Sequence, residues 1–168
     1  MIVLYAVGLV FFVFFMLIVF RGAPYVPTKS ADVSSLFDVV KFKPGETLVD
    51  LGSGDGRLLK AAAERGISAV GYELNPFLVL VTWFRLRRHS RLARVSMQDF
   101  WLSDLPNRTK VVFVFLGTPY MKKLDKYLTQ QVARLGQDVR LVSYGVPVPG
   151  REPEQEDGAL LVYLYKKA

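Results

Sequence analysis

Residues 48–76, "LVDLGSGDGRLLKAAAERGISAVGYELNP", decide the fold. An apolar run leads into three alternate glycines, Gly52, Gly54 and Gly56, and a helical pattern and a second apolar run follow. Glycines between a strand and a helix let the backbone turn sharply and bring the N–H groups of the helix close to a ligand. The stretch therefore predicts a strand, loop, helix and strand that bind a nucleotide-like molecule.

The spacing of the loop and its acidic residues separate two classes of ligand. Dinucleotide enzymes favour Gly-x-Gly-x-x-Gly beneath a pyrophosphate, whereas this loop is Gly-x-Gly-x-Gly with Asp50 and Asp55 beside it. Two carboxylates would repel a pyrophosphate and suit S-adenosylmethionine, which is cationic and has no phosphate. Glu73, at the end of the second apolar run, can accept hydrogen bonds from both ribose hydroxyls. The pattern favours S-adenosylmethionine over NAD, with an ordinary strand-to-helix turn as the structural alternative.

A third group of candidate residues lies in "SMQDFW", residues 96–101. Asp99 can accept a hydrogen bond from the adenine amine and Phe100 can pack on the ring, unless the two are a helix N-cap and a core aromatic. The predicted cofactor-binding residues are Asp50, Gly52, Ser53, Gly54, Asp55, Gly56, Glu73, Leu74, Asn75, Asp99 and Phe100.

Strand and helix patterns alternate along the rest of the chain. With 168 residues and 51% hydrophobic composition, there is room for one domain with a buried core. The expected strands are 47–51, 68–73, 93–97, 111–116, 139–145 and 159–165, and the expected helices are 56–65, 76–88 and 119–135 after one that starts at Ser30 or Asp32. We expect a solvated connection at 147–158. The alternation predicts an α/β fold with a mostly parallel, Rossmann-like sheet and helices on both faces.

The composition excludes several kinds of chemistry. The chain has no cysteine, and His89 is its one histidine. Disulfide scaffolds, thiolate nucleophiles and zinc sites built from cysteine or several histidines are therefore excluded, and we expect no metal. The chemistry must come from a cofactor, from carboxylates or from hydroxyls.

The segment "MIVLYAVGLVFFVFFMLIVF", residues 1–20, carries no charged side chain. As a helix it would span roughly 30 Å, the thickness of a bilayer core. We expect a transmembrane anchor, with a cleaved signal peptide or a buried helix as alternatives. Positive charge begins at Arg21, so the expectation is a single-pass membrane protein that contacts the bilayer through residues 1–20 and has its catalytic domain in the cytoplasm. A proline-containing connector or lid (21–29) then leads to the domain proper (30–168).

The net charge of +7 is concentrated in "RLRRHSRLAR", residues 85–94. This run is interpreted first as a solvated helix end, then as a contact for anionic lipid or an acidic partner, and last as a nucleic-acid contact.

Five stretches together carry a family resemblance. They are "APYVPT" (23–28), "LVDLGSGDGRL" (48–58), "GYELNP" (71–76), "FLGTPYMKKLDKYL" (115–128) and "SYGVPVPG" (143–150). The chain resembles the seven-strand class I methyltransferases that use S-adenosylmethionine and release S-adenosylhomocysteine. Within them it is similar to the membrane-anchored lysine methyltransferases that modify the ATP synthase c subunit and the adenine nucleotide translocase of mitochondria.

The resemblance implies that a lysine ε-amine in a protein at or in a membrane accepts the methyl group. It implies that residues 24–28 fold over the cofactor and that the acceptor side follows the fourth strand. The residues that it places at the methyl transfer are Tyr25, Thr28, Thr118, Pro119 and Tyr120.

Two departures from the family pattern concern the acceptor. Many amino-group methyltransferases carry Asn/Asp-Pro-Pro-Tyr where this chain has Gly-Thr-Pro-Tyr (117–120), so the group that orients the amine stays open. Arg151 stands where an aromatic residue is expected. The alternatives to a lysine methyltransferase are an RNA or small-molecule methyltransferase and a membrane-tethered module that binds the cofactor without catalysis.

Overall fold

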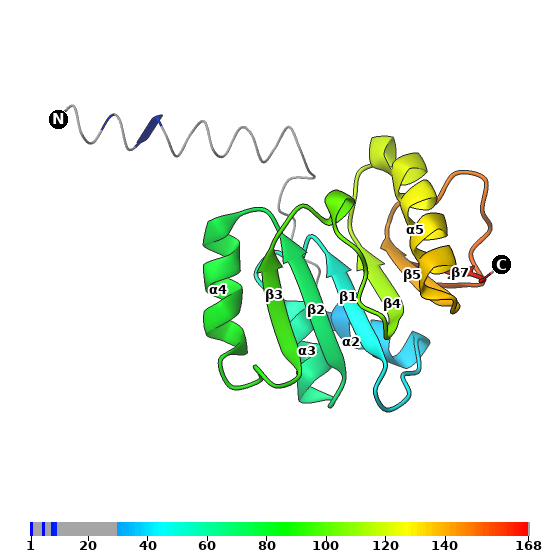
Figure 1. Ribbon diagram of the computed structural model, residues 1–168, viewed down its shortest axis with the longest axis horizontal. Helices are drawn as coiled ribbons and strands as arrows, with labels where there is room; N and C mark the ends of the chain where they lie inside the picture. Colours follow the sequence, from blue (N-terminus) through cyan, green and yellow to red (C-terminus); the bar gives the residue numbers. More distant parts are fainter. Residues whose placement is uncertain (2–4, 6–7, 10–29, 168) are drawn as a thin grey trace.

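The computed structural model describes residues 1, 5, 8–9 and 30–167, and its centre is a seven-stranded sheet (Figure 1). The strand order is β3-β2-β1-β4-β5-β7-β6. The strands are β1 (Thr47–Leu51), β2 (Ser68–Glu73), β3 (Ala93–Met97), β4 (Thr109–Val114), β5 (Val139–Tyr144), β6 (Gln155–Asp157) and β7 (Leu160–Tyr165). The first five run parallel, and β7 is antiparallel to both β5 and β6. The predicted α/β sheet, mostly parallel, is confirmed.

Helices cover both faces of the sheet. The helical elements are α2 (Ser30–Val39), α3 (Arg57–Glu64), α4 (Pro76–Leu86), η1 (Phe100–Leu102), η2 (Thr118–Tyr120) and α5 (Met121–Leu135). One core cluster joins α5 to the sheet, and the other joins α2, α3 and the end of α4 to the opposite face. Side chains of a strand point alternately to the two faces, so Val49 and Leu51 enter the first cluster and Leu48 enters the second.

Strand β6 lies within the stretch that we expected to be a solvated connection. All three of its residues are exposed, and it pairs with β7 at the edge of the sheet. An edge strand without a buried face needs no apolar alternation, and "QED" has none. The prediction was therefore wrong about the hydrogen bonding of this segment and right about its exposure.

The topology determines where a site can form. Parallel strands end at a common edge, and the chain order reverses between β1 and β4, which lie side by side. In open α/β sheets, ligands bind at this reversal, outside the carboxyl ends of the strands. The glycine loop follows β1 and the Thr-Pro-Tyr segment follows β4, so both leave the sheet at this point.

The predicted localisation, a single-pass membrane protein with a cytoplasmic domain, is corrected here. Across the described residues, no helix has both the length and the apolar character needed to cross a bilayer. Most of the segment that suggested an anchor, and all of the connector at 21–29, lies outside the described residues.

Candidate functional site

The glycine loop adopts a left-handed backbone conformation that residues other than glycine rarely take. Gly52, Gly54 and Gly56 have φ of 98°, 54° and 73°. The loop is tied to the neighbouring strand because the N–H groups of Gly52 and Ser53 both donate to the Tyr72 carbonyl at 2.9 Å. A Cβ built at Gly52 meets no atom within 4 Å, so the space beside this residue is open. The loop is thus a fixed cradle that a ligand can approach closely.

Glu73 connects the glycine loop to the end of β2. Its carboxylate oxygens accept hydrogen bonds from Gly54 N at 2.9 Å and from Asn75 N at 2.8 Å. Each oxygen has a second lone pair, so the group can still accept hydrogen bonds from two hydroxyls. Asn75 caps α4 by accepting from Phe77 N at 2.9 Å, and half-buried Leu74 lies between the two.

Asp50 is the more deeply buried of the two aspartates beside the glycine loop. Its side chain, in β1, is 5% exposed. Burial raises its pKa to about 8, and the nearby negative charges of Glu73 and Asp55 add to the effect. A cation bound beside Asp50 would favour its charged form and lower this pKa.

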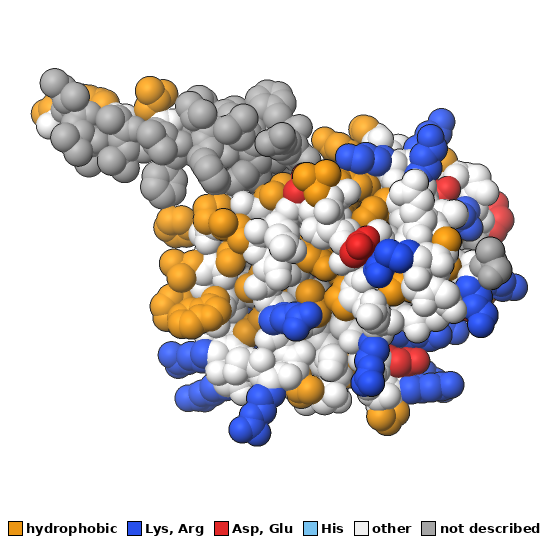
Figure 2. Space-filling model, in the orientation of Figure 1, with side chains coloured by type: hydrophobic (Ala, Val, Ile, Leu, Met, Phe, Trp, Pro, Cys, Tyr) orange, Lys and Arg blue, Asp and Glu red, His pale blue; other side chains and the backbone are white. Residues whose placement is uncertain are grey.

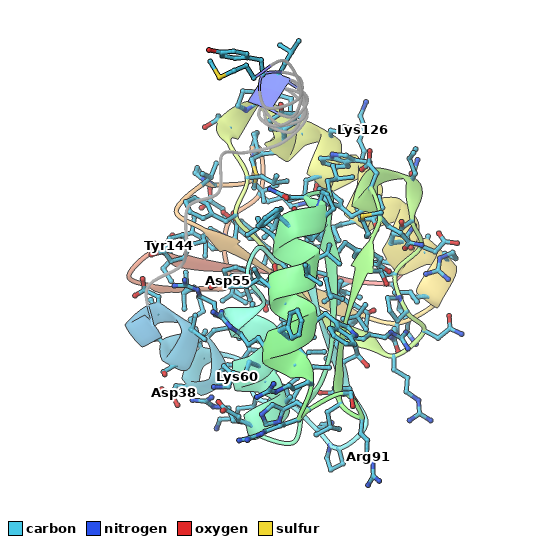
Figure 3. All side chains as sticks on the ribbon, turned by 90° about the vertical axis from the view of Figure 1, so that its left-hand side faces the viewer. Asp38, Asp55, Lys60, Arg91, Lys126 and Tyr144 are labelled. Carbon is cyan, nitrogen blue, oxygen red and sulfur yellow. The ribbon has the colours of Figure 1, made fainter. Side chains whose placement is uncertain are left out.

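Asp55 has a different electrostatic environment. Its carboxylate pairs with Arg57 at 3.1 Å and with Arg85 at 2.6 Å, and Figure 3 labels it beside α4. Burial disfavours its charged form, but hydrogen bonds from the two guanidinium groups outweigh burial and hold its pKa below the usual value. Its negative charge is therefore balanced within the protein.

Ser53 fills space that a glycine in β2 leaves open. A Cβ at Gly71 would lie 2.6 Å from the Ser53 side chain and from Leu59. Within the described residues the buried Ser53 hydroxyl has no hydrogen-bond partner. The sequence did not single out Gly71, whose role depends on this contact across the sheet.

Asp99 and Phe100 make the contacts of a helix N-cap and a core aromatic, the alternative to adenine binding. Asp99 caps η1 by accepting from Trp101 N at 3.0 Å. Phe100 is buried and its ring centroid lies 4.4 Å from that of Trp101 and 6.2 Å from that of Tyr127. Both follow β3 at the same edge of the sheet as the glycine loop, and their contact with adenine stays a prediction.

The predicted acceptor residues lie directly after β4. Thr118 and Pro119 are exposed and Tyr120 is half-buried. They form η2, which Tyr120 N closes by donating to Gly117 O at 3.0 Å. The other two predicted residues, Tyr25 and Thr28, lie outside the described residues.

Two side-chain networks escaped the sequence analysis. Tyr144 Oη, at the end of β5, donates to Asp32 Oδ2 at 2.5 Å, and the Tyr144 ring lies 4.9 Å from that of Phe115. Asp32 and Tyr144 are 112 positions apart in the chain, so no local pattern could join them. Arg151 pairs with Asp125 at 2.5 Å, which accounts for a guanidinium where an aromatic was expected.

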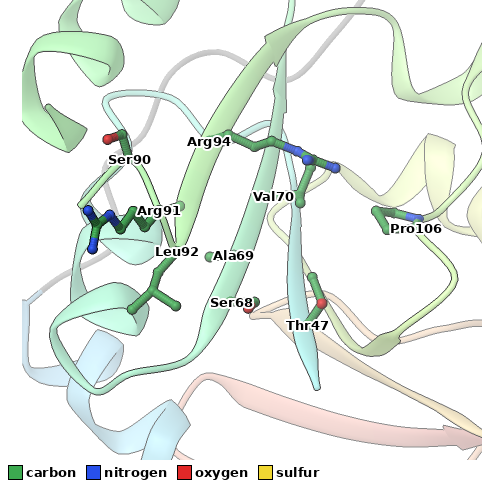
Figure 4. A pocket seen from close by; sticks show the side chains of 10 residues that line it. Thr47, Ser68, Ala69, Val70, Ser90, Arg91, Leu92, Arg94 and Pro106 are labelled. Atoms are coloured by element: carbon green, nitrogen blue, oxygen red, sulfur yellow. The ribbon is translucent and has the colours of Figure 1, made fainter. Parts of the chain in front are cut away.

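No metal site is found in the part of the chain that the structure describes, since no three His, Cys, Asp or Glu residues there could hold an ion. A hollow of about 220 Å³ lies at the opposite edge of the sheet, where Thr47, Ser68 and Arg91 line it (Figure 4). It is separate from the glycine loop because it is built on the amino ends of β1 and β2.

Comparisons with known proteins agree with this geometry. Residues 50–155 match the family model described as the ANTKMT methyltransferase domain. The human lysine N-methyltransferase of the ATP synthase c subunit is 36% identical over 80% of this chain and 57% of its own length. Mouse "Adenine nucleotide translocase lysine N-methyltransferase" is 36% identical over 77% and 56%. A "Protein-lysine N-methyltransferase" of Saccharolobus islandicus is 30% identical over 84% and 92%.

A solved structure has the same arrangement. It is an RNA methyltransferase from Salinibacter ruber in complex with S-adenosyl-L-homocysteine, with a TM-score of 0.73 and 26% identity over 84% of this chain and 93% of that one. The chain spans little more than half the length of the human and mouse relatives. The matches confirm the resemblance inferred from the sequence, and the chain belongs to the ANTKMT methyltransferase domain family.

Proposed function

We propose that this protein transfers a methyl group from S-adenosylmethionine to the ε-amine of a lysine in another protein. The observation that carries the proposal is the glycine loop, which Glu73 holds at the carboxyl end of β1, where the chain order reverses between β1 and β4. The names of the relatives support lysine as the acceptor, above all the Saccharolobus protein, whose length this chain almost completely covers.

The residues around the loop fit an adenosine cofactor with a positive charge. Gly52 leaves open space beside the backbone, and Glu73 has lone pairs for the ribose hydroxyls. Asp50 supplies a carboxyl group that ionises more readily beside a cation. The remaining residues assigned to the cofactor are Ser53, Gly54, Asp55, Gly56, Leu74, Asn75, Asp99 and Phe100. When bound, S-adenosylmethionine supplies an electrophilic methyl group on its sulfonium.

The protein's contribution to the reaction is mainly alignment. Methyl transfer is an in-line displacement, so the protein must hold a neutral amine opposite the methyl group. We assign this task to the segment after β4, with the Thr118 and Tyr120 hydroxyls orienting the amine and Pro119 setting the turn. Tyr25 and Thr28 are proposed to complete the acceptor side.

The acceptor lysine must lose a proton before it can attack. Its reference pKa is about 10.4, and transfer into an apolar environment lowers this value. A strong general base is then unnecessary, because desolvation favours the neutral amine before the displacement begins.

A second candidate is methyl transfer to RNA, which is favoured by the similarity to the Salinibacter RNA methyltransferase over most of both chains. A third is a module that binds the cofactor without catalysis. The three candidates differ in which molecule, if any, carries the transferred methyl group after the reaction.

The test uses the purified full chain, tritiated S-adenosylmethionine, and the soluble and membrane fractions of its source cells, each treated afterwards with protease or ribonuclease. We expect protease-sensitive label that Glu73→Ala abolishes and that Glu152→Ala, a change at an exposed acid, leaves in place. Label in the membrane fraction would support the narrower proposal that the acceptor protein lies at a membrane. Ribonuclease-sensitive label would favour RNA, and cofactor binding without label would favour the non-catalytic module.

A further inference from the structure

Helix α4 contacts the rest of the described protein through a narrow inner face. Thr82 and Leu86 are its buried residues, whereas Leu80, Trp83 and Phe84 are exposed. Figure 2 shows apolar side chains gathered over α4 at the left of the molecule. On the inner side, Thr82 and Arg85 both reach the glycine loop. The helix is thus attached to the loop rather than only to the sheet.

Thr82 contacts the loop at two glycines. Its hydroxyl, fully buried, donates to Gly54 O at 2.9 Å. Its Cγ2 atom lies 2.4 Å from the position that a Cβ at Gly56 would take. One side chain of α4 therefore fixes a carbonyl of the loop and fills the space that the missing Cβ leaves.

Arg85 contacts the same loop through Asp55. Its Nη1 lies 2.6 Å from Asp55 Oδ2, while Arg57 Nε of α3 lies 3.1 Å from Oδ1. Arg57 Nη2 also donates to Oδ2 at 3.1 Å, so guanidinium groups from two helices share this oxygen. Both guanidinium groups are about one-third exposed, so water partly screens these pairs.

The pairing also affects the charge near Asp50. Asp55 is one of the two acids whose negative charge acts on Asp50, and Arg85 offsets that charge. Without Arg85, Asp55 would hold a less compensated charge beside the buried carboxyl group. Arg85 therefore affects the ionisation of Asp50 indirectly, through its pair with Asp55.

We propose that Thr82 and Arg85 are positioning residues for the cofactor. They hold the glycine loop in its left-handed conformation, and Arg85 joins Arg57 in neutralising Asp55, so that Asp50 meets the positive charge of the ligand while Glu73 accepts from its ribose hydroxyls. The inference rests on the proposed cofactor, and it requires neither side chain to touch that molecule.

The test measures cofactor affinity by calorimetry with S-adenosylhomocysteine and S-adenosylmethionine. It also measures kcat and the KM for S-adenosylmethionine, with the source-cell fraction that becomes methylated as the acceptor. We expect Arg85→Gln and Thr82→Val each to weaken cofactor binding and raise its KM about tenfold, the scale of one lost charge-assisted or buried hydrogen bond, with kcat nearly unchanged. Arg85→Lys and Thr82→Ser should recover most of the affinity. Arg88→Gln, at an exposed arginine of the same basic run, is the matched control and should bind like the wild type.

The pH profile separates positioning from a general effect on folding. In Arg85→Gln, Asp55 keeps only its pair with Arg57, so its less compensated charge should move the midpoint of the pH dependence of S-adenosylmethionine affinity upward, because Asp50 becomes harder to ionise. Wild-type affinity and midpoint in Arg85→Gln would overturn the inference, as would a loss confined to kcat. If Arg85→Gln does not fold, the conservative variants Arg85→Lys and Thr82→Ser decide the question. A tenfold loss of cofactor affinity in both of them would overturn the inference. If the wild type itself binds neither ligand, it is the proposed function that fails.

Discussion

Binding of S-adenosylmethionine should release a proton from Asp50. The buried carboxyl group has a pKa of about 8 in the free protein because of burial and of the charges on Glu73 and Asp55. At about pH 7 it is therefore roughly 90% protonated, by the ordinary titration relation. A bound cation lowers this pKa, so complete ionisation in the complex releases about 0.9 proton per cofactor.

The assay is titration calorimetry at about pH 7 in two buffers whose ionisation enthalpies differ, since the difference in heat gives the number of protons released. Asp50→Asn keeps the shape of the side chain and removes the titration, so this variant should release almost none and should bind more weakly. If the wild type and Asp50→Asn exchange the same number of protons with the buffer, Asp50 does not ionise on binding, and its assignment as the acid that meets the cation is refuted.

Three further predictions concern stability and turnover. Because the folded pKa of Asp50 is raised, the stability that it contributes is full below its unfolded pKa near 4 and is lost as pH rises to about 8. Asp50→Asn should therefore gain stability relative to wild type across this window, by at most about 6 kcal/mol at the alkaline end. Urea unfolding at several pH values checks this, and a difference that is constant with pH would contradict the raised pKa. Gly56→Ala should destabilise the protein by about 2 kcal/mol or more, because φ is +73° and the new Cβ would lie 2.4 Å from Thr82. In thermal melts, adding Thr82→Ala should recover part of this loss of stability. No recovery would show that the contact with Thr82 is not responsible. Tyr120→Phe should lower kcat about tenfold with near-normal cofactor affinity, and full turnover in steady-state assays would remove its hydroxyl from the mechanism.

The glycine loop could be predicted from the sequence because its information is local. Gly52, Gly54 and Gly56 mark a turn that few other residues can adopt, and Glu73 ends a strand whose apolar pattern is plain. The parallel sheet follows from the alternation of strand and helix patterns. These features need no knowledge of how distant segments pack.

The contacts that complete the site could not be predicted because they depend on packing. Thr82 and Arg85 reach the loop only because α4 presents one particular face to it, and a helical pattern with apolar residues on nearly every side does not indicate that face. Asp32 and Tyr144 meet across the fold. The charge balance at Asp55 depends on the same packing, so the sequence suggested a free acid where the structure has a paired one.

Peptide mass spectrometry tests the central claim most directly. The source-cell fractions are first incubated with S-adenosylmethionine and either the wild-type protein or Glu73→Ala. The account predicts one or more lysines that gain the mass of a methyl group with the wild type and remain unmodified with Glu73→Ala, while the variant keeps its fold. Methylation confined to RNA, or no methylated lysine from a wild-type protein that binds the cofactor, would contradict it.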